Sequence, residues 1–516
     1  MTTAPLPAAG REQLGPLEGA ARAAADELAD TKAIERLWQR DHTLWQDDPT
    51  EVADRLGWLD SPLDMQERVA ALDAFADQVA GDGLRHAVVL GMGGSSLFPE
   101  VLARTFPAAL LELRILDTTD PAAVRRIERE LPLDATLFVA SSKSGTTIET
   151  TSALQYFRET VRNGSRFAAV TDPGTPLARQ GRDAGFRAVF ENRPDIGGRY
   201  SALSLFGLVP AALAGIDVSR LLQSAAMMLE VSAPNSIMPR DNPSLRLAAV
   251  LTAGVREGRD KLTVLLPPEV ASFGAWLEQL VAESTGKQGT GIVPVVDEPL
   301  GPVEVYGDDR LFVTYGPAGV DALAASGHPV VELPLLDAHG LGAEVLRWEL
   351  ATALTGALLG INPFDQPDVA AAKEATARVL DAGVPDIEPE PLAGLLDRVS
   401  VGDYLAIQAY VDPGSPAVGS LQAARVALRD RLRVSTTLGL GPRYLHSTGQ
   451  LHKGGPPSGV FVQVVSDDPE DVLIPGRPFG FSTLTHAQAA GDLAALQSRG
   501  LRAGRVALGE LLEEAR

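Results

Sequence analysis

The stretch LFVASSKSGTTIET (residues 137–150) passes from an apolar run into a loop of small hydroxyl side chains. The run 137–140 predicts a buried strand. Apolar residues at near-helical spacing then predict a helix, at Ile148, Leu154, Phe157 and Val161. Hydroxyl groups beside the free N–H groups of a helix start favour an anion site, although a polar turn with an ordinary Ser/Thr cap is the alternative. The stretch therefore predicts a strand–loop–helix unit, with a phosphate cradle as the functional hypothesis.

The same alternation of strand and helix recurs along the chain from about residue 84. The apolar runs are HAVVLGMGG, RILD, TLFVASS, FAAVTD and RAVFEN, followed after a buried helix (201–216) by KLTVLLPP, GIVPVV, RLFVTYG and PVVELPLL. Nearly continuous apolar strands separated by helices are typical of doubly wound parallel sheets. The expected fold class is therefore α/β, with two such domains.

The expected boundaries divide the chain into four parts. Residues 1–65 are a helical N-terminal extension, with Trp38, Trp45 and Trp58 expected to anchor it to the body. The two α/β domains cover 66–235 and 236–385. Residues 386–516 are a C-terminal extension of mixed structure that carries a His-containing loop.

Composition limits the function. A chain of 516 residues suits two or three domains, and a net charge of −22 argues against general nucleic-acid binding. The absence of cysteine excludes disulfides, thiolate metal sites and cysteine nucleophiles. The N-terminal segment lacks the pattern of a signal peptide, and no membrane span is evident, so a cytoplasmic location is the default expectation.

A second small-residue loop, GMGGSS (91–96), follows the apolar strand AVVL. It does not match the dinucleotide pattern G-x-G-x-x-G, because Ser96 occupies the third glycine position, and it is not a P-loop. Ligands of open α/β sheets bind beyond the carboxyl ends of the strands. Since both loops leave such ends in one predicted sheet, their convergence strengthens the phosphate hypothesis.

Four further stretches offer reactive side chains. GGRYSALS (197–204) uses two glycines to bring Arg199 near a cleft, although a surface Arg in a turn is the alternative. In AWLEQLVAESTGKQGTG (275–291), Gln279 and Glu283 share one helix face, and Gly286 is placed to end the helix. Glu283 is a candidate general base, against the alternative of a solvated helical carboxylate.

The last two stretches supply a lysine and two histidines. INPFDQPDVAAAK (361–373) predicts a helix that carries Lys373, which is either functional or part of a capped surface helix. YLHSTGQLHKGGPPSG (444–459) contains His446 and His452. Their spacing and the lack of a nearby carboxylate disfavour zinc, so an active-site loop is the preferred interpretation.

Taken together, these motifs resemble the glucose-6-phosphate isomerase family, in which two sugar-isomerase (SIS) domains lie side by side. The Trp-rich N-terminus and HSTGQLHKGGP are similar to the isomerase half of bacterial transaldolase/glucose-6-phosphate isomerase fusions, although no transaldolase barrel fits within 516 residues. The resemblance implies interconversion of glucose 6-phosphate and fructose 6-phosphate in glycolysis and gluconeogenesis, without a metal or other cofactor.

The resemblance also implies roles for individual residues. Glu283 would be the base, Arg199 would stabilise the enediolate, and Lys373 and His446 would assist ring opening. The expected substrate-binding groups are Gly94, Ser95, Ser142, Lys143, Ser144, Gly145, Thr146, Thr147, Gln279 and Gln366. The His loop follows Lys373 here, whereas in most of the family it precedes the Lys motif, so His452 is the competing catalytic histidine.

Two alternatives stay open, together with an expectation about assembly. The enzyme could also accept mannose 6-phosphate, or the chain could be a non-catalytic SIS module that senses a phosphosugar. By analogy with the family, a homodimer is expected in which the partner subunit supplies the His. The 444–459 loop is rich in glycine and poor in large apolar residues, so we expect it to need a second chain to order it.

Overall fold

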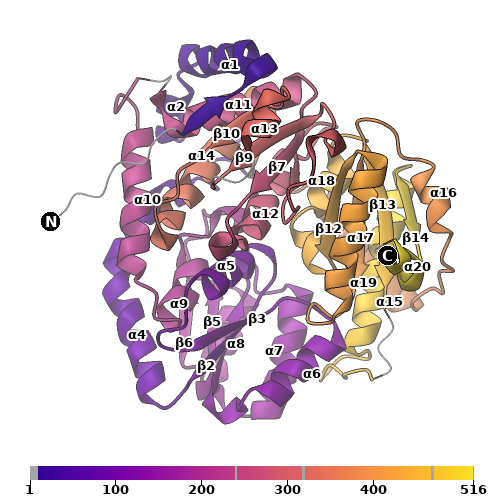
Figure 1. Cartoon of the computed structure of the whole chain (residues 1–516). Coiled ribbons are helices and arrows are strands. Elements are labelled where there is room, and N and C mark those ends of the chain that lie inside the picture. Colours follow the sequence, from indigo (N-terminus) through magenta and orange to yellow (C-terminus); the bar gives the residue numbers. More distant parts are fainter. Residues whose placement is uncertain (1–9, 239–240, 317–319, 467–469, 515–516) are drawn as a thin grey trace.

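Three mainly parallel β-sheets, each flanked by helices, make up the chain (Figure 1). The computed structural model describes residues 10–238, 241–316, 320–466 and 470–514. Helices and strands alternate through all three units. The predicted α/β class with parallel sheets is therefore confirmed.

The first sheet has the order β3-β2-β4-β5-β6, and all its strands are parallel. Its strands are β2 (His86–Leu90), β3 (Glu112–Leu116), β4 (Thr136–Ser141), β5 (Phe167–Thr171) and β6 (Ala188–Glu191). The helices of this unit are α4 (Val69–Gly81), α5 (Leu97–Thr105), α6 (Pro121–Glu130), α7 (Ile148–Val161), α8 (Pro176–Asp183) and α9 (Leu205–Leu213). Every residue of β4 is buried, as its apolar run predicts, and α7 begins at Ile148, directly after the hydroxyl-rich loop.

The second sheet has the order β1-β10-β9-β7-β8. Its strands are β1 (Arg11–Gln13), β7 (Lys261–Leu265), β8 (Val293–Val295), β9 (Arg310–Thr314) and β10 (Val330–Glu332). Its helices are α1 (Glu18–Asp30), α10 (Val218–Ser232), α11 (Pro243–Arg256), α12 (Phe273–Thr285), α13 (Val320–Ala325) and α14 (Leu341–Leu359). The short strand β1 joins this sheet antiparallel to β10, so the otherwise helical N-terminal segment adds an edge strand that the sequence pattern did not predict.

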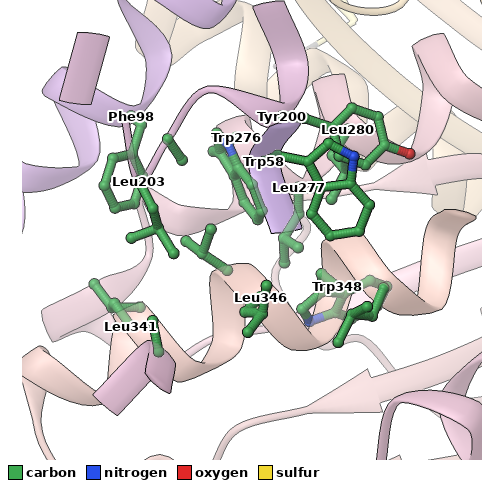
Figure 2. Close-up of a cluster of buried hydrophobic side chains, with 14 of the residues drawn as sticks. Trp58, Phe98, Tyr200, Leu203, Trp276, Leu277, Leu280, Leu341, Leu346 and Trp348 are labelled. Atoms are coloured by element: carbon green, nitrogen blue, oxygen red, sulfur yellow. The ribbon is translucent and has the colours of Figure 1, made fainter. Parts of the chain in front are cut away.

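The first two units share one hydrophobic core (Figure 2). Trp276 of α12 stacks on Phe273, with ring centroids 5.2 Å apart, and its edge meets Phe98 of α5. Trp58 and Trp348 are also fully buried in this cluster. A continuous core fixes the two sheets relative to each other, which any site between them requires.

The N-terminal helices α2 (Ala33–Trp38) and α3 (Ser61–Asp64) lie against the same core. Trp45 and Trp58 are buried, and the indole of Trp45 donates a hydrogen bond to the carbonyl of Ala353 at 2.8 Å. Trp38 is half-buried against the core. All three tryptophans thus contact the body, as the sequence analysis expected.

The C-terminal segment contains both helices and strands, as expected. It forms a parallel sheet of order β12-β11-β13-β14, seen in orange and yellow at the right of Figure 1. The strands are β11 (Tyr404–Tyr410), β12 (Ser435–Leu440), β13 (Gly459–Val465) and β14 (Arg502–Arg505). The helices are α16 (Leu392–Leu396), α17 (Ala417–Leu432), α18 (Gly449–Gly454), α19 (Phe481–Ser498) and α20 (Leu508–Glu513).

The helix that carries Lys373, α15 (Val369–Ala382), packs against α19 of the C-terminal unit. In the sequence it is expected at the end of the second domain, whose predicted boundary is residue 385. By its packing, α15 belongs with the C-terminal unit.

Within the described ranges, none of the helices combines the length and the apolar character that crossing a lipid bilayer requires.

Candidate active site

The two small-residue loops leave neighbouring strands of the first sheet at the same edge. GMGGSS follows β2 and SSKSGTT follows β4, and these strands pair in parallel. The expected convergence of the two loops is therefore present. The GMGGSS loop forms the short 3-10 helix η5 (Gly93–Ser95) before α5 begins.

The hydroxyl-rich loop is held by its own side chains. Ser142 Oγ and Thr147 Oγ1 lie 2.9 Å apart, and the backbone N–H of Gly145 donates to Ser142 Oγ at 3.1 Å. Gly145 has φ +67°, a left-handed conformation that favours glycine. Thr147, the N-cap residue of α7, makes no side-chain capping bond to the first turn. The N–H groups of that turn can therefore receive an anion.

A cavity of about 240 Å³ opens beside this loop. Its walls come from three parts of the chain: the loop, helix α15, and the C-terminal unit. They include Ser144, Thr146, Thr147, Lys373, His446 and Gln488. The structure thus brings together three of the predicted phosphate-binding residues with the predicted Lys and His.

His446 is held by a buried carboxylate that the sequence analysis missed. Nε2 of His446 lies 3.0 Å from Oε1 of Glu149, which is 5% exposed in the first turn of α7. Burial acts to raise the pKa of Glu149, but the charge and hydrogen bond of His446 hold that pKa below its ordinary value. The contact fixes the orientation of the imidazole ring beside the carboxylate.

Gln488 of α19 completes this cluster. Its Nε2 donates to the same Oε1 of Glu149 at 2.7 Å, and its Oε1 accepts a hydrogen bond from Thr119 Oγ1 at 2.8 Å. Because an ionised carboxylate can only accept hydrogen bonds, the amide N–H of Gln488 faces Glu149 and its oxygen faces Thr119. In the sequence, Glu149 looks like an ordinary first-turn residue of a helix, and no local pattern marks Gln488 as a site residue.

Glu283, Arg199 and Gln279 form a second cluster next to the first. Glu283 Oε1 lies 3.0 Å from Arg199 Nη1, and both side chains are almost fully buried. Gln279 Nε2 donates to Glu283 Oε2 at 3.1 Å and to the carbonyl of His446 at 2.7 Å. As predicted, Gln279 and Glu283 share a face of α12, and Gly286 is the C-cap of that helix. Gln279 therefore joins the carboxylate to the segment that carries His446.

Glycines allow the loops around this cluster to touch through their backbones. A Cβ at Gly94 would overlap the carbonyl of Gly198, which begins the short helix η8 (Gly198–Tyr200) that carries Arg199. A Cβ at Gly93 would lie 2.9 Å from Gln279 Nε2 and 3.0 Å from the carbonyl of His446. GMGGSS therefore packs directly on the Arg199 loop and on the His446 segment.

Other predicted site residues lie outside both clusters. The ammonium group of Lys143 bonds Asp172 and the carbonyl of Pro194, so its side chain is directed to a neighbouring loop. Ser95 is buried in η5, and Gln366 is exposed in the loop before α15.

His452, the competing histidine, faces away from the cavity. It is buried among aromatic rings of the C-terminal unit, including Tyr404 and Phe461, and its Nδ1 lies 3.1 Å from Gln408 Nε2. Burial, reinforced by the charge of Lys453, holds its pKa well below the ordinary value. His446, and not His452, lines the cavity.

The His loop, which was expected to need a second chain for its order, is folded by contacts within its own chain. The loop folds into the 3-10 helix η13 (Arg443–His446) and then α18, and its own chain buries it. Lys453 pairs with Asp492 of α19 at 2.5 Å, and Tyr444 donates to the same carboxylate at 2.7 Å. Long-range polar contacts therefore replace the large apolar residues that the loop lacks, and His446 enters its own chain's cavity.

No group of three or more His, Cys, Asp or Glu side chains suited to a metal ion occurs in the described part of the chain. What the site does contain is a carboxylate paired with a guanidinium, an imidazole paired with a second carboxylate, and hydroxyl groups at a helix N-terminus. This set can bind a phosphate group, move a proton and stabilise a developing oxyanion.

Comparison with known sequences agrees with this chemistry. A family model described as phosphoglucose isomerase matches residues 32–309, more than half of the chain. A probable glucose-6-phosphate isomerase from Natronomonas pharaonis is 31% identical over 362 residues, covering 60% of this chain and 82% of the relative. A glucose-6-phosphate isomerase from Synechococcus sp. (strain JA-3-3Ab) is 31% identical over 350 residues, and the match covers 56% of this chain and 65% of that relative.

Solved structures show the same fold. A hypothetical protein from Thermus thermophilus superposes with a TM-score of 0.61 at 25% identity, over 72% of this chain and all of the other. A glucose-6-phosphate isomerase from Chlamydia trachomatis superposes with a TM-score of 0.58 at 20% identity, over 70% and 86% of the two chains.

The contact between the two glycine loops gives a direct test of the site's geometry. Gly94→Ala should lower the thermal unfolding midpoint and separate Arg199 from Glu283, because the new methyl group meets backbone atoms that cannot rotate away. Gly198→Ala is the matched control, since a Cβ there meets nothing within 4 Å. Calorimetry and a crystal structure of each variant would check this, and equal midpoints for the two variants would contradict it.

Proposed function

The chain belongs to the phosphoglucose isomerase family and interconverts glucose 6-phosphate and fructose 6-phosphate, and we propose that its two adjoining clusters divide this reaction between them. The cavity beside α7 binds the phosphate and opens the sugar ring. The Glu283–Arg199 pair moves the proton between C1 and C2. The observation that carries the proposal is the hydrogen-bond path from Glu283 through Gln279 to the His446 segment.

Glu283 is the base in this proposal. A carboxylate on a rigid buried helix can take the proton from one carbon and return it to the next. Arg199 contacts the same carboxylate at 3.0 Å, so its guanidinium also lies beside the enediolate oxygens that gain charge. Backbone carbonyls of Pro363 and Asp365 accept hydrogen bonds from Arg199 and hold it in place.

His446 and Lys373 serve the ring oxygen in this proposal. Glu149 orients the imidazole of His446 through the contact at Nε2. Gln488 acts through Glu149, so it is a positioning residue. The hydroxyl groups of Ser144, Thr146 and Thr147, with the N-terminus of α7, hold the phosphate at a fixed distance from the reacting carbons.

The finer identity of the chain is also a proposal. We assign the first two sheets to two SIS domains, with the four-stranded C-terminal unit as an addition that supplies His446 and Gln488. This layout is what we expect of a relative of the isomerase half of the transaldolase fusions. A homodimer stays a proposal, with each site complete in one chain.

Glu283→Gln should lower kcat by at least about a hundredfold while changing the KM for fructose 6-phosphate little, because it removes the base and leaves the phosphate loop intact. A coupled assay that supplies fructose 6-phosphate and detects glucose 6-phosphate would measure both constants. Glu269→Gln, an exposed carboxylate just before α12, is the control. A variant that keeps about a tenth of the kcat would identify another residue as the base.

Gln488→Leu should lower kcat by roughly ten- to a hundredfold, since the buried carboxylate of Glu149 loses a charge-assisted hydrogen bond. Loss of a donor raises a carboxylate's pKa, so the acidic limb of the kcat–pH profile should move to higher pH. Gln497→Leu changes an exposed residue of the same helix and should leave the profile in place. Matching profiles for the two variants would show that Gln488 does not act through Glu149.

Mixing the inactive variants Glu283→Gln and His446→Ala should restore no activity, because both residues serve the same chain's site. Differently tagged subunits would verify that the chains exchange. If the histidine instead crossed between subunits, random pairing would return up to about a quarter of the wild-type activity.

A further inference from the structure

A second cavity, of about 510 Å³, is lined by residues of all three units, the first, the second and the C-terminal one. Helix α5 contributes Glu100, helix α12 contributes Glu278, and the C-terminal unit contributes Arg425 from α17 and Ser447 from the His segment. Neither Glu283 nor any residue of the hydroxyl-rich loop lines it. The cavity is therefore separate from the site described above.

Arg425 carries a charge that the protein itself leaves unpaired. The side chain is 2% exposed. Its Nε donates to the carbonyl of Thr436 at 2.9 Å and its Nη1 to Gln422 at 3.3 Å. Among the described residues, its Nη2 has no hydrogen-bond partner. Burial lowers the pKa of Arg425, and the charges of Glu298, Asp297 and Glu278 only partly offset that effect. A buried guanidinium left in this state is costly unless an acceptor reaches it.

Glu278 presents the opposite charge to the same space. It is half-buried, and it accepts one hydrogen bond, from Ser447 at 3.3 Å. Burial, reinforced by the nearby Asp297, raises the pKa of Glu278 to about 7. It forms no ion pair with Arg425, although both line the cavity, so the space between them separates two complementary charges.

The charge of Arg443 in this cavity is already satisfied. Arg443 pairs with Glu100 at 2.6 Å and with Asp117 at 2.7 Å. Those groups shape the wall and need no ligand. The open positions are therefore one donor, at Arg425, and the acceptors of two carboxylates, Glu278 and the neighbouring Asp297, which also lines the cavity.

We propose that this cavity binds a small zwitterion of amino-acid size, whose carboxylate accepts from Arg425 Nη2 and whose ammonium group donates to Glu278. The volume falls within the range of about 300–1,000 Å³ common for small-molecule sites. It exceeds what one amino acid fills, so ordered water would share the cavity. A singly charged molecule would leave either Arg425 or Glu278 without a partner.

The ligand site adjoins the catalytic one through two shared elements. In η13 and just beyond it, Tyr444 and Ser447 line the second cavity, whereas Leu445 and His446 line the catalytic cavity. In α12, Glu278 is followed directly by Gln279, which bonds both Glu283 and the His446 carbonyl. A ligand that moves Glu278 or Ser447 would thus act on the isomerase as an effector.

The test is binding of the proteinogenic amino acids, one at a time at millimolar concentration, with acetate and ethylammonium as singly charged controls. Thermal unfolding and isothermal titration of the full chain report binding without reference to activity. At least one amino acid should raise the unfolding midpoint, and neither control should. Arg425→Met and Glu278→Gln should each weaken that binding by about tenfold or more, whereas Glu269→Gln, a charge at the exposed rim, should change it much less.

If Arg425→Met fails to fold, Glu278→Gln alone tests the proposal, because it keeps the shape of a half-buried side chain. Binding should persist in the presence of fructose 6-phosphate and change kcat. The proposal is overturned if no amino acid binds, which leaves a water-filled cavity, if both variants bind normally, or if the sugar phosphate displaces the ligand.

Discussion

A fully buried ion pair between Lys453 and Asp492 determines where the histidine of the site lies. Burying two charges is costly unless further hydrogen bonds satisfy them. Here Tyr444 donates to Asp492, and Lys453 also donates to the carbonyl of Gly449. The pair therefore ties α18 and η13 to α19, and His446 has one position from which to face the hydroxyl-rich loop. This constraint explains why one chain completes the site.

The same constraint makes the site a product of three units. The first sheet supplies the phosphate loop, the second supplies Glu283 on α12, and the C-terminal unit supplies His446 and Gln488. Backbone contacts at Gly93 and Gly94 hold these parts at distances that a side chain would prevent. A shift of any unit would separate Glu283 from His446. The continuous core shared by the first two sheets prevents such a shift between them.

Local pattern predicted the parts of this arrangement that depend on neighbours in sequence. The buried strand β4, the start of α7 and the end of α12 all follow from periodicity and capping residues. The side chains that contact His446 could not be predicted in this way. Gln488 lies 339 residues from Glu149, and no sequence signal links them. The His loop has few apolar residues of its own, and the contacts that stabilise it come from α19, which local sequence does not reveal. Likewise, the sequence does not show that Lys143 bonds Asp172.

The two cavities differ in whether their hydrogen-bonding groups have partners within the protein. The chain has a net charge of −22, and in the proposed site a phosphate would be held largely by hydroxyl groups and helix N–H groups. Such groups hydrogen-bond to one another when no ligand is bound, as Ser142 does with Thr147, so the phosphate loop is stable without its ligand. Arg425 in the second cavity has no such internal partner for its Nη2 among the described residues. A protein that satisfies its phosphate loop in the unliganded state has the means to satisfy a guanidinium too. Leaving Arg425 Nη2 open is therefore best explained by a ligand that pairs with it.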